Sequence, residues 1–225
     1  EVVKRLNKNP HSVTITDAKT NQTNTISLNG FDFLGWIVDF MLSNNPEAIS
    51  AAPLQIHKVF QDNYESFKEF TDSKLSPAGY AWGMRYSVWC GEEIPFENHR
   101  KIKSQSFLYP KIKGLEIMSI PDICRVWKVS PAKPIENEFV KSDVPTLFIT
   151  GEYDAYTPTS WAKQTAEKLK NSFQIEVPWV GHVPTNSSPA CLREVVADFF
   201  DNPMSAPKSE CLSAVKKQFK FEVKK

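Results

Sequence analysis

The C-terminal part of the sequence predicts the α/β fold class. Residues 144–150 form a near-continuous apolar run, which is typical of a strand buried on both faces of a parallel sheet. An amphipathic segment at 161–169, an alternating segment at 173–177 and a second amphipathic segment at 191–200 follow. Strand, helix, strand and helix at short spacing indicate α/β architecture with right-handed crossovers. Because two strands do not make a stable covered sheet, we expect further strands from a missing N-terminal region or another chain.

The N-terminal part predicts a small hairpin followed by short helices. Residues 1–9 are expected to be the end of a helix that Pro10 stops. Residues 13–16 and 25–28 each alternate apolar with polar side chains, which predicts two strands joined by a polar turn. Apolar residues at helical spacing, with Asp32 as a cap, predict a helix that ends at Asn44-Asn45-Pro46. Further short helices are expected at 53–60, 64–70, 80–89 and 98–110.

Composition bounds the function classes. The 225 residues suffice for one large domain or a domain with a subdomain, and 41% hydrophobic with 24% charged residues is globular composition. The net charge of +1 gives no electrostatic reason to expect nucleic acid or an acidic membrane as partner. No run approaches the ~20 apolar residues of a membrane helix. The aromatic content of 12% fits a core of large rings or an aromatic-lined cleft. A chain that opens Glu1-Val2-Val3 is expected to be a processed or trimmed product.

Cysteines and histidines give no sign of a metal site or a cofactor. No two cysteines form a C-x-x-C pair, which excludes a zinc knuckle and a thioredoxin-type motif. Their even number fits two disulfides in an oxidising compartment, although four buried free thiols in a cytosolic protein fit the composition equally well. The four cysteines are Cys90, Cys124, Cys191 and Cys211. The histidines lie scattered, without ligand spacing, at His11, His57, His99 and His182.

Asp154 and His182 are the candidate catalytic residues. Asp154 follows the first predicted strand after Gly151, and His182 follows the second directly after Gly181. The carboxyl ends of strands carry the functional groups of open α/β sheets, so the two side chains are expected to meet. An aspartate there would fix the histidine tautomer, and the free ring nitrogen would act as general base. A lone aspartate in a loop is usually just a turn residue, and a lone histidine is usually a surface or packed residue. The occurrence of both, in order, at consecutive strand ends favours a catalytic role.

Five segments of the chain carry a resemblance, in order. The segment VPTLFITGEYDAYTP (144–158) contains Asp154, and the segment VPWVGHVP (177–184) contains His182. They resemble the acid-bearing and histidine segments of the tripeptidyl-aminopeptidase and proline-iminopeptidase branch of the α/β-hydrolases. The segment CLREVVADFFDNP (191–203) resembles its closing helix with a flanking cysteine. YSVWCGEEIPF (86–96) and CRVWKV (124–129) resemble a lid motif and a Cys-Trp segment that precedes the acid strand.

The resemblance implies a chain that lacks its nucleophile. Residues 1–135 would be a mainly helical lid with an N-terminal hairpin, and 136–225 the last strands and helices of an α/β-hydrolase core. The stretch 129–138 is rich in proline and charged residues, which predicts a linker between these two parts. The family's serine sits in Gly-x-Ser-x-Gly, but the one glycine pair at this spacing, Gly79 and Gly83, encloses Ala81. In this family the triad residues follow one another along the chain in the order Ser, Asp, His, so we expect the serine upstream of Glu1. We therefore expect this chain alone to have no hydrolase activity.

The resemblance also implies a substrate and a compartment. An aminopeptidase binds a free α-ammonium group, for which carboxylates serve well. The lid motif usually reads Cys-x-Glu, so Glu92 is the first candidate and Glu93 the second, unless both are solvated residues near a helix end. Implied disulfides are Cys90–Cys124 and Cys191–Cys211, in a secreted protein or one of the periplasm or cell envelope. The lysine-rich end, 216–225, is expected to be a solvated tail or a last helical turn.

The sequence therefore predicts part of a secreted serine hydrolase, an aminopeptidase that releases short N-terminal peptides or residues by Ser-His-Asp acyl transfer. Its expected partners are a peptide with a free N-terminus and the missing N-terminal half of the hydrolase, from the same gene or a separate chain. No cofactor, nucleic acid or transmembrane segment is expected. The alternatives are a non-catalytic peptide- or ligand-binding domain and an esterase of the same fold.

Overall fold

The structure is a computed structural model in which the chain forms two compact units. Unit 1 comprises Glu1–Trp36 and Asn63–Glu138, and unit 2 comprises Ile37–Asp62 and Phe139–Lys225. The predicted division into residues 1–135 and 136–225 stays a prediction. The structure describes residues 1–16, 21–67, 81–98, 100–101, 104, 120–186 and 190–222.

A short helix and a hairpin open unit 1. Helix α1 (Val2–Lys8) ends before Pro10, as predicted, because proline has no N–H with which to continue the helical hydrogen bonds. Strands β1 (His11–Thr16) and β2 (Thr23–Leu28) pair antiparallel, with His11 opposite Leu28 and Thr16 opposite Thr23. Alternate residues of β1 are buried, which is the pattern that the sequence predicts for this strand.

Two helices follow the hairpin, and each is capped by an asparagine; the first runs from unit 1 into unit 2, and the second lies in unit 2. In α2 (Gly30–Leu42), the Asn29 carboxamide accepts from the N–H of Phe31 at 2.7 Å, and Asp32 accepts from the N–H of Asn29 at 2.7 Å. We expected Asp32 itself to cap the helix. Instead Asn29 is the cap, and Asp32 completes it by binding the N–H of Asn29 in return. Helix α3 (Pro46–Phe60) begins seven positions before the start that we predicted at Pro53, because Asn45 caps it and Pro46 occupies the first turn.

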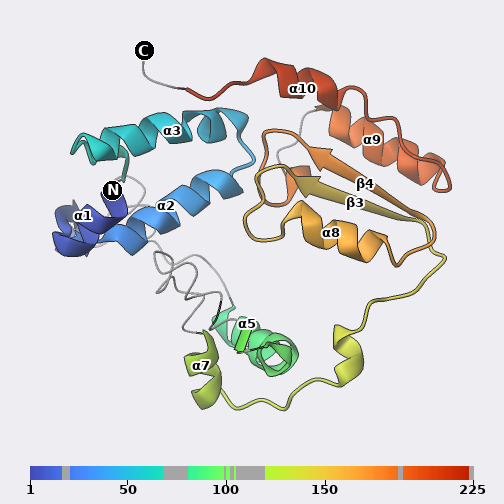
Figure 1. Ribbon diagram of the computed structural model, residues 1–225, viewed down its shortest axis with the longest axis horizontal. Coiled ribbons are helices and arrows are strands. Elements are labelled where there is room, and N and C mark those ends of the chain that lie inside the picture. The colour runs from blue at the N-terminus through green and yellow to red at the C-terminus, as the bar shows by residue number, and fades with distance from the viewer. Residues whose placement is uncertain are drawn as a thin grey trace. The chain divides into compact units, whose positions relative to one another are not determined.

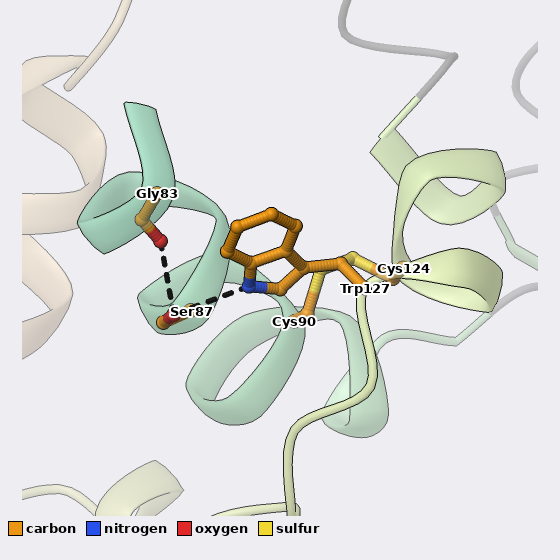
Figure 2. Close-up of a disulfide and its surroundings, with 5 residues drawn as sticks. All are labelled: Gly83, Ser87, Cys90, Cys124 and Trp127. Carbon is orange, nitrogen blue, oxygen red and sulfur yellow. Dashed lines mark hydrogen bonds between the residues drawn. A yellow bond between two sulfur atoms is a disulfide. The ribbon is translucent and has the colours of Figure 1, made fainter. Parts of the chain in front are cut away.

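The remainder of unit 1 is built from short helical pieces. The disulfide between Cys90 and Cys124 joins the π-helical turn η1 to helix α7. Beside it, the indole N–H of Trp127 donates to Ser87 Oγ at 3.1 Å, and Ser87 Oγ donates to the carbonyl of Gly83 at 2.9 Å (Figure 2). Most of the helix expected over 98–110, and the end of the helix expected over 64–70, lie outside the described residues. The pieces are α5 (Trp82–Val88), η1 (Trp89–Glu93), η2 (Ile94–Phe96), α7 (Ile120–Val126) and η4 (Pro134–Asn137).

Unit 2 carries a parallel strand pair with helices on both faces, which is the α/β arrangement that the sequence predicts (Figure 1). Thr146 lies opposite Ser172, and Gly151 opposite Val177. Helix α8 covers one face, where Thr159 donates to the Thr150 hydroxyl at 3.0 Å. Helices α9 and α10 cover the other face. The elements are β3 (Thr146–Gly151), α8 (Thr159–Ala166), β4 (Ser172–Val177), η5 (Pro184–Asn186), α9 (Ala190–Asp201) and α10 (Leu212–Gln218).

The core of unit 2 lies between the sheet and helices α9 and α10. Its fully enclosed members come from β4, the turn after it and the two helices, and Leu147 and Ile149 of β3 pack against them. The first four residues of β3 are only half buried, which corrects our expectation of a strand buried on both faces. The reason is that, within the described residues, β3 pairs with β4 alone. The buried core residues are Ile175, Val177, Val180, Leu192, Val195 and Leu212.

Among the described residues, no helix combines the length and apolar character needed to cross a membrane.

Candidate active site

Asp154 and His182 contact each other at the carboxyl ends of β3 and β4. The distance between His182 Nδ1 and Asp154 Oδ2 is 2.9 Å. The side chain of Asp154 is 3% exposed, whereas that of His182 is 37% exposed. The arrangement therefore combines a buried carboxylate that orients the ring with an imidazole that solvent and a reacting group can reach.

Two glycines allow the strand ends to converge. The parallel register places Gly151 opposite Val177, so the loops after β3 and β4 leave the sheet at the same level. A Cβ on Gly151 would lie 2.0 Å from the carbonyl oxygen of Gly181, and a Cβ on Gly181 would lie 2.3 Å from the carbonyl oxygen of Met41. Only glycine fits at either position, because real Cβ atoms do not approach backbone atoms so closely.

The Asp154 carboxylate accepts hydrogen bonds at both oxygens. The backbone N–H groups of Tyr156 and Thr157 donate to Oδ1 at 2.9 and 2.8 Å, and the Thr157 hydroxyl donates to Oδ2 at 2.6 Å. Burial by itself raises the pKa of Asp154, but the hydrogen bonds from Thr157, His182 and Tyr156 lower it, and its net pKa lies below the ordinary value. The carboxylate is therefore ionised at neutral pH, as the partner of an imidazolium must be.

Thr157 is a residue of this site that the sequence analysis missed. Its hydroxyl lies 3.3 Å from His182 Nδ1 as well as 2.6 Å from Asp154 Oδ2, so it contacts both members of the pair. The signal that could have identified it is its spacing, because an aspartate side chain often accepts from residues two and three positions on.

The backbone around His182 is held by the end of α2 and the residues after it. Gly181 N–H donates to the carbonyl of Ser43 at 2.6 Å, and His182 N–H donates to the carbonyl of Leu42 at 3.1 Å. The Asn44 side chain donates to the carbonyl of His182 at 2.5 Å. No local pattern connects segments so distant in sequence, and the sequence analysis did not foresee these contacts. They fix the histidine main chain independently of its ring.

Non-glycine residues with left-handed backbone conformation stand on both sides of His182. Trp179 has φ of +59° and Val183 has φ of +55°. Positive φ is uncommon for bulky side chains and is an outlier for a β-branched one. Such conformations persist where surrounding contacts impose them, and they gather at functional sites.

Glu92 and Glu93 belong to unit 1, and Asp154 and His182 belong to unit 2. Both glutamates lie in η1 with exposed side chains, and the carbonyl of Glu92 accepts from the Asn137 carboxamide at 3.4 Å. Their role in binding stays a prediction.

Each of the two units contains one disulfide. Cys90–Cys124 lies in unit 1 and Cys191–Cys211 in unit 2, which are the pairings that the resemblance implies. The part of the chain that the structure describes has no group of three or more side chains suited to hold a metal ion.

Comparison with known proteins agrees with this geometry. Unit 2 places an Asp-His pair at the carboxyl ends of its two parallel strands. The family model described as "TAP-like protein" matches residues 112–211, a segment that includes both Asp154 and His182. The match supports an α/β-hydrolase and hence a hydrolase. The searches of curated proteins and of solved structures found no match.

Proposed function

We propose that Asp154 and His182 are the acid and base members of a Ser-His-Asp triad in a secreted serine hydrolase. The observation that carries this proposal is the 2.9 Å contact between a buried carboxylate and an accessible imidazole. The pair stands where α/β enzymes carry their functional groups, at the carboxyl ends of adjacent parallel strands.

The contact between His182 and Asp154 supports a different role for each ring nitrogen. Nδ1 lies against Asp154, so the neutral imidazole carries its proton there and leaves Nε2 as the acceptor. Nε2 takes the proton of the attacking serine hydroxyl while the serine oxygen bonds to the substrate carbonyl carbon. The imidazolium then gives that proton to the leaving amine, and water releases the acyl group by the same exchange. Ionised Asp154 stabilises the imidazolium in both stages.

The serine comes from outside these 225 residues in our proposal. Within the sequence, the glycine pair with the required spacing encloses Ala81 rather than serine. The nucleophile half, in the same polypeptide or a separate one, adds the serine and the oxyanion hole, and it adds strands to the sheet of which β3 and β4 are two.

The proposed substrate is a peptide with a free N-terminus. The exposed glutamates of η1, Glu92 first and Glu93 second, bind its α-ammonium group through charge-assisted hydrogen bonds. The two disulfides favour a secreted or cell-envelope location, because such bonds persist in oxidising compartments.

An active-serine phosphonate probe tests the triad. This chain alone is expected to remain unlabelled, whereas an assembly of the chain with the nucleophile half is expected to be labelled at the serine of Gly-x-Ser-x-Gly. The variant His182→Gln should abolish that labelling, with His57→Gln, on α3, as the matched control. Labelling of this chain alone, or full labelling of the His182→Gln assembly, would show that the assignment is wrong.

A further inference from the structure

We propose that Trp179 is a positioning residue through which the C-terminal segment, residues 211–222, holds the loops that carry Asp154 and His182. This inference rests on the proposed function of that pair and adds a distal segment on which its geometry depends.

The ring of Trp179 is surrounded by side chains of the acid-bearing loop and the C-terminal segment. It is 8% exposed although it lies in a loop. Its ring centroid is 5.7 Å from that of Tyr153, 5.0 Å from that of Phe221 and 6.2 Å from that of Phe219. The indole N–H donates to the carbonyl of Lys216 at 3.4 Å. One side chain thus contacts both the residue that precedes Asp154 and the C-terminal segment.

The backbone of Trp179 is joined to the acid-bearing loop as well. Its N–H donates to Glu152 Oε2 at 3.1 Å, and the N–H of Tyr153 donates to the carbonyl of Val180 at 3.0 Å. Trp179 adopts φ of +59°, which a bulky residue rarely adopts without support. The Glu152 carboxylate and the packed ring supply that support. The conformation of Trp179 in turn sets the direction in which the chain approaches His182, three residues later.

The C-terminal segment is itself fixed at several points. The Cys191–Cys211 disulfide ties its start to α9, and Leu212 is buried in the core of unit 2. Near its end, the N–H of Glu222 donates to the carbonyl of Ser50 in α3 at 2.7 Å. The middle of the segment is therefore held against Trp179 by attachments on either side. We expected a solvated tail or a last helical turn over residues 216–225. Residues 216–218 are the end of helix α10, and Phe219 and Phe221 pack on a loop of the candidate site.

The position of Phe221 allows the inference to be tested with a mild change. Phe221 is 46% exposed, so its truncation leaves a small cavity and should not unfold the unit. Phe200 on α9 is 74% exposed and serves as the matched control, because it has the same side chain in the same unit. The conservative variant Trp179→Phe keeps an aromatic ring and loses the bond to Lys216, whereas Trp179→Ala loses both.

The tautomer of His182 is a readout that a merely structural role would not change. Ring 15N shifts of the isolated, folded chain in mildly alkaline solution distinguish Nδ1–H from Nε2–H, and thermal melting confirms that each variant is folded at the recording temperature. We expect Nδ1–H in the unsubstituted chain, in Phe200→Ala and for the most part in Trp179→Phe. We expect loss of the Nδ1–H preference in Trp179→Ala and Phe221→Ala.

The outcomes separate the two proposals. If the unsubstituted chain lacks the Nδ1–H tautomer, the Asp154–His182 pair is not a triad pair, and both proposals fail. If the unsubstituted chain has it and folded Trp179→Ala and Phe221→Ala retain it unchanged, the pair stands and the positioning role is wrong. An equal loss of the Nδ1–H preference in Phe200→Ala and Phe221→Ala would also overturn the positioning role, because the effect would then not depend on contact with Trp179.

Discussion

Gly151 and Gly181 face each other across the ends of two parallel strands with no room for a side chain between them. A Cβ built on Gly151 would lie 2.0 Å from the carbonyl oxygen of Gly181 and 2.6 Å from that of Val180. Both neighbouring atoms belong to the backbone, so neither can rotate aside. The approach of these two residues brings the loops that carry Asp154 and His182 together.

The variant Gly151→Ala should therefore destabilise unit 2. Overpacking against flexible side chains costs about 1–3 kcal/mol, and rigid backbone neighbours place this variant at or above the upper end of that range. The control is Gly35→Ala in α2, where the added Cβ meets nothing within 4 Å. Alanine in a helix interior should stabilise the chain there by about 1 kcal/mol. Urea unfolding should show a lower free energy of unfolding for Gly151→Ala and a higher one for Gly35→Ala. Equal effects in the two variants would contradict this prediction.

Asp154 should make the stability of the chain sensitive to acid. Its pKa is lowered in the folded state, so the folded chain binds fewer protons than the unfolded chain as the solution is acidified. The contribution is present above the unfolded pKa of about 3.9 and is lost as pH falls through the lower folded pKa. Unfolding measured across this range should show a steeper loss in the unsubstituted chain than in Asp154→Asn. Coincident pH profiles for the two chains would show that Asp154 makes no such contribution.

Thr157→Val should raise the pKa of Asp154 while leaving the loop folded. The substitution keeps the shape of the side chain but removes the hydroxyl that donates to Asp154 Oδ2 at 2.6 Å. The backbone N–H of Thr157 still donates to Oδ1, so part of the lowering persists. A hydrogen bond to a charged group contributes about 1.5–3 kcal/mol, which sets the scale of the effect. A 13C titration of the Asp154 carboxyl checks it, and Thr157→Ser, which retains a hydroxyl, should titrate like the unsubstituted chain.

Glu92→Gln tests the proposed recognition of the substrate, in the chain assembled with the proposed nucleophile half. The loss of one charge-assisted hydrogen bond, worth about 1.5–3 kcal/mol, should weaken binding of free-amine peptides roughly 10- to 100-fold. N-blocked esters carry no ammonium group, and their KM should change little. Glu97→Gln is the matched control, with an exposed carboxylate directly after η2 and no proposed part in binding. Equal losses for both substrate classes would exclude Glu92 as the ammonium ligand.

Removal of either disulfide should destabilise the chain, and the two losses should be similar. Cys191 and Cys211 are separated by 20 residues and Cys90 and Cys124 by 34. In the chain-entropy model these loops contribute about 3 and about 3.5 kcal/mol. Paired cysteine-to-serine variants and urea unfolding give the comparison. Mass measurement without reductant should find no free thiol, and four free thiols would refute both bonds and weaken the proposed location.

The sequence predicted those elements whose signal is local. Pro10 marked the end of α1, and the alternation of residues 13–16 and 25–28 marked the hairpin. The apolar run 144–150 and the segment 173–177 marked the parallel strands to within two residues. The predicted range of α3 starts too late, at Pro53, which lies within a helix that Asn45 caps.

In the candidate site, too, the sequence predicted the residues whose signal is local and missed the contacts between distant segments. Asp154 and His182 follow glycines at strand ends, so topology alone predicted that they would meet, and the structure places them 2.9 Å apart. Thr157 required the recognition of a turn around an aspartate side chain. The contacts of Asn44 with the histidine loop and of Phe221 with Trp179 join segments far apart in the sequence. No periodicity or spacing within one segment encodes such pairs.

The left-handed residues that flank His182 have a consequence for how the proposed hydrolase would lose its activity. Because Trp179 and Val183 hold φ values that their side chains disfavour, release of the neighbouring contacts would let this loop relax first. Warming, or detachment of the chain beyond Gln218, would then disable the imidazole while β3, β4 and their covering helices remain folded. Heat inactivation of the assembled hydrolase would precede its melting, and brief cooling would reverse it.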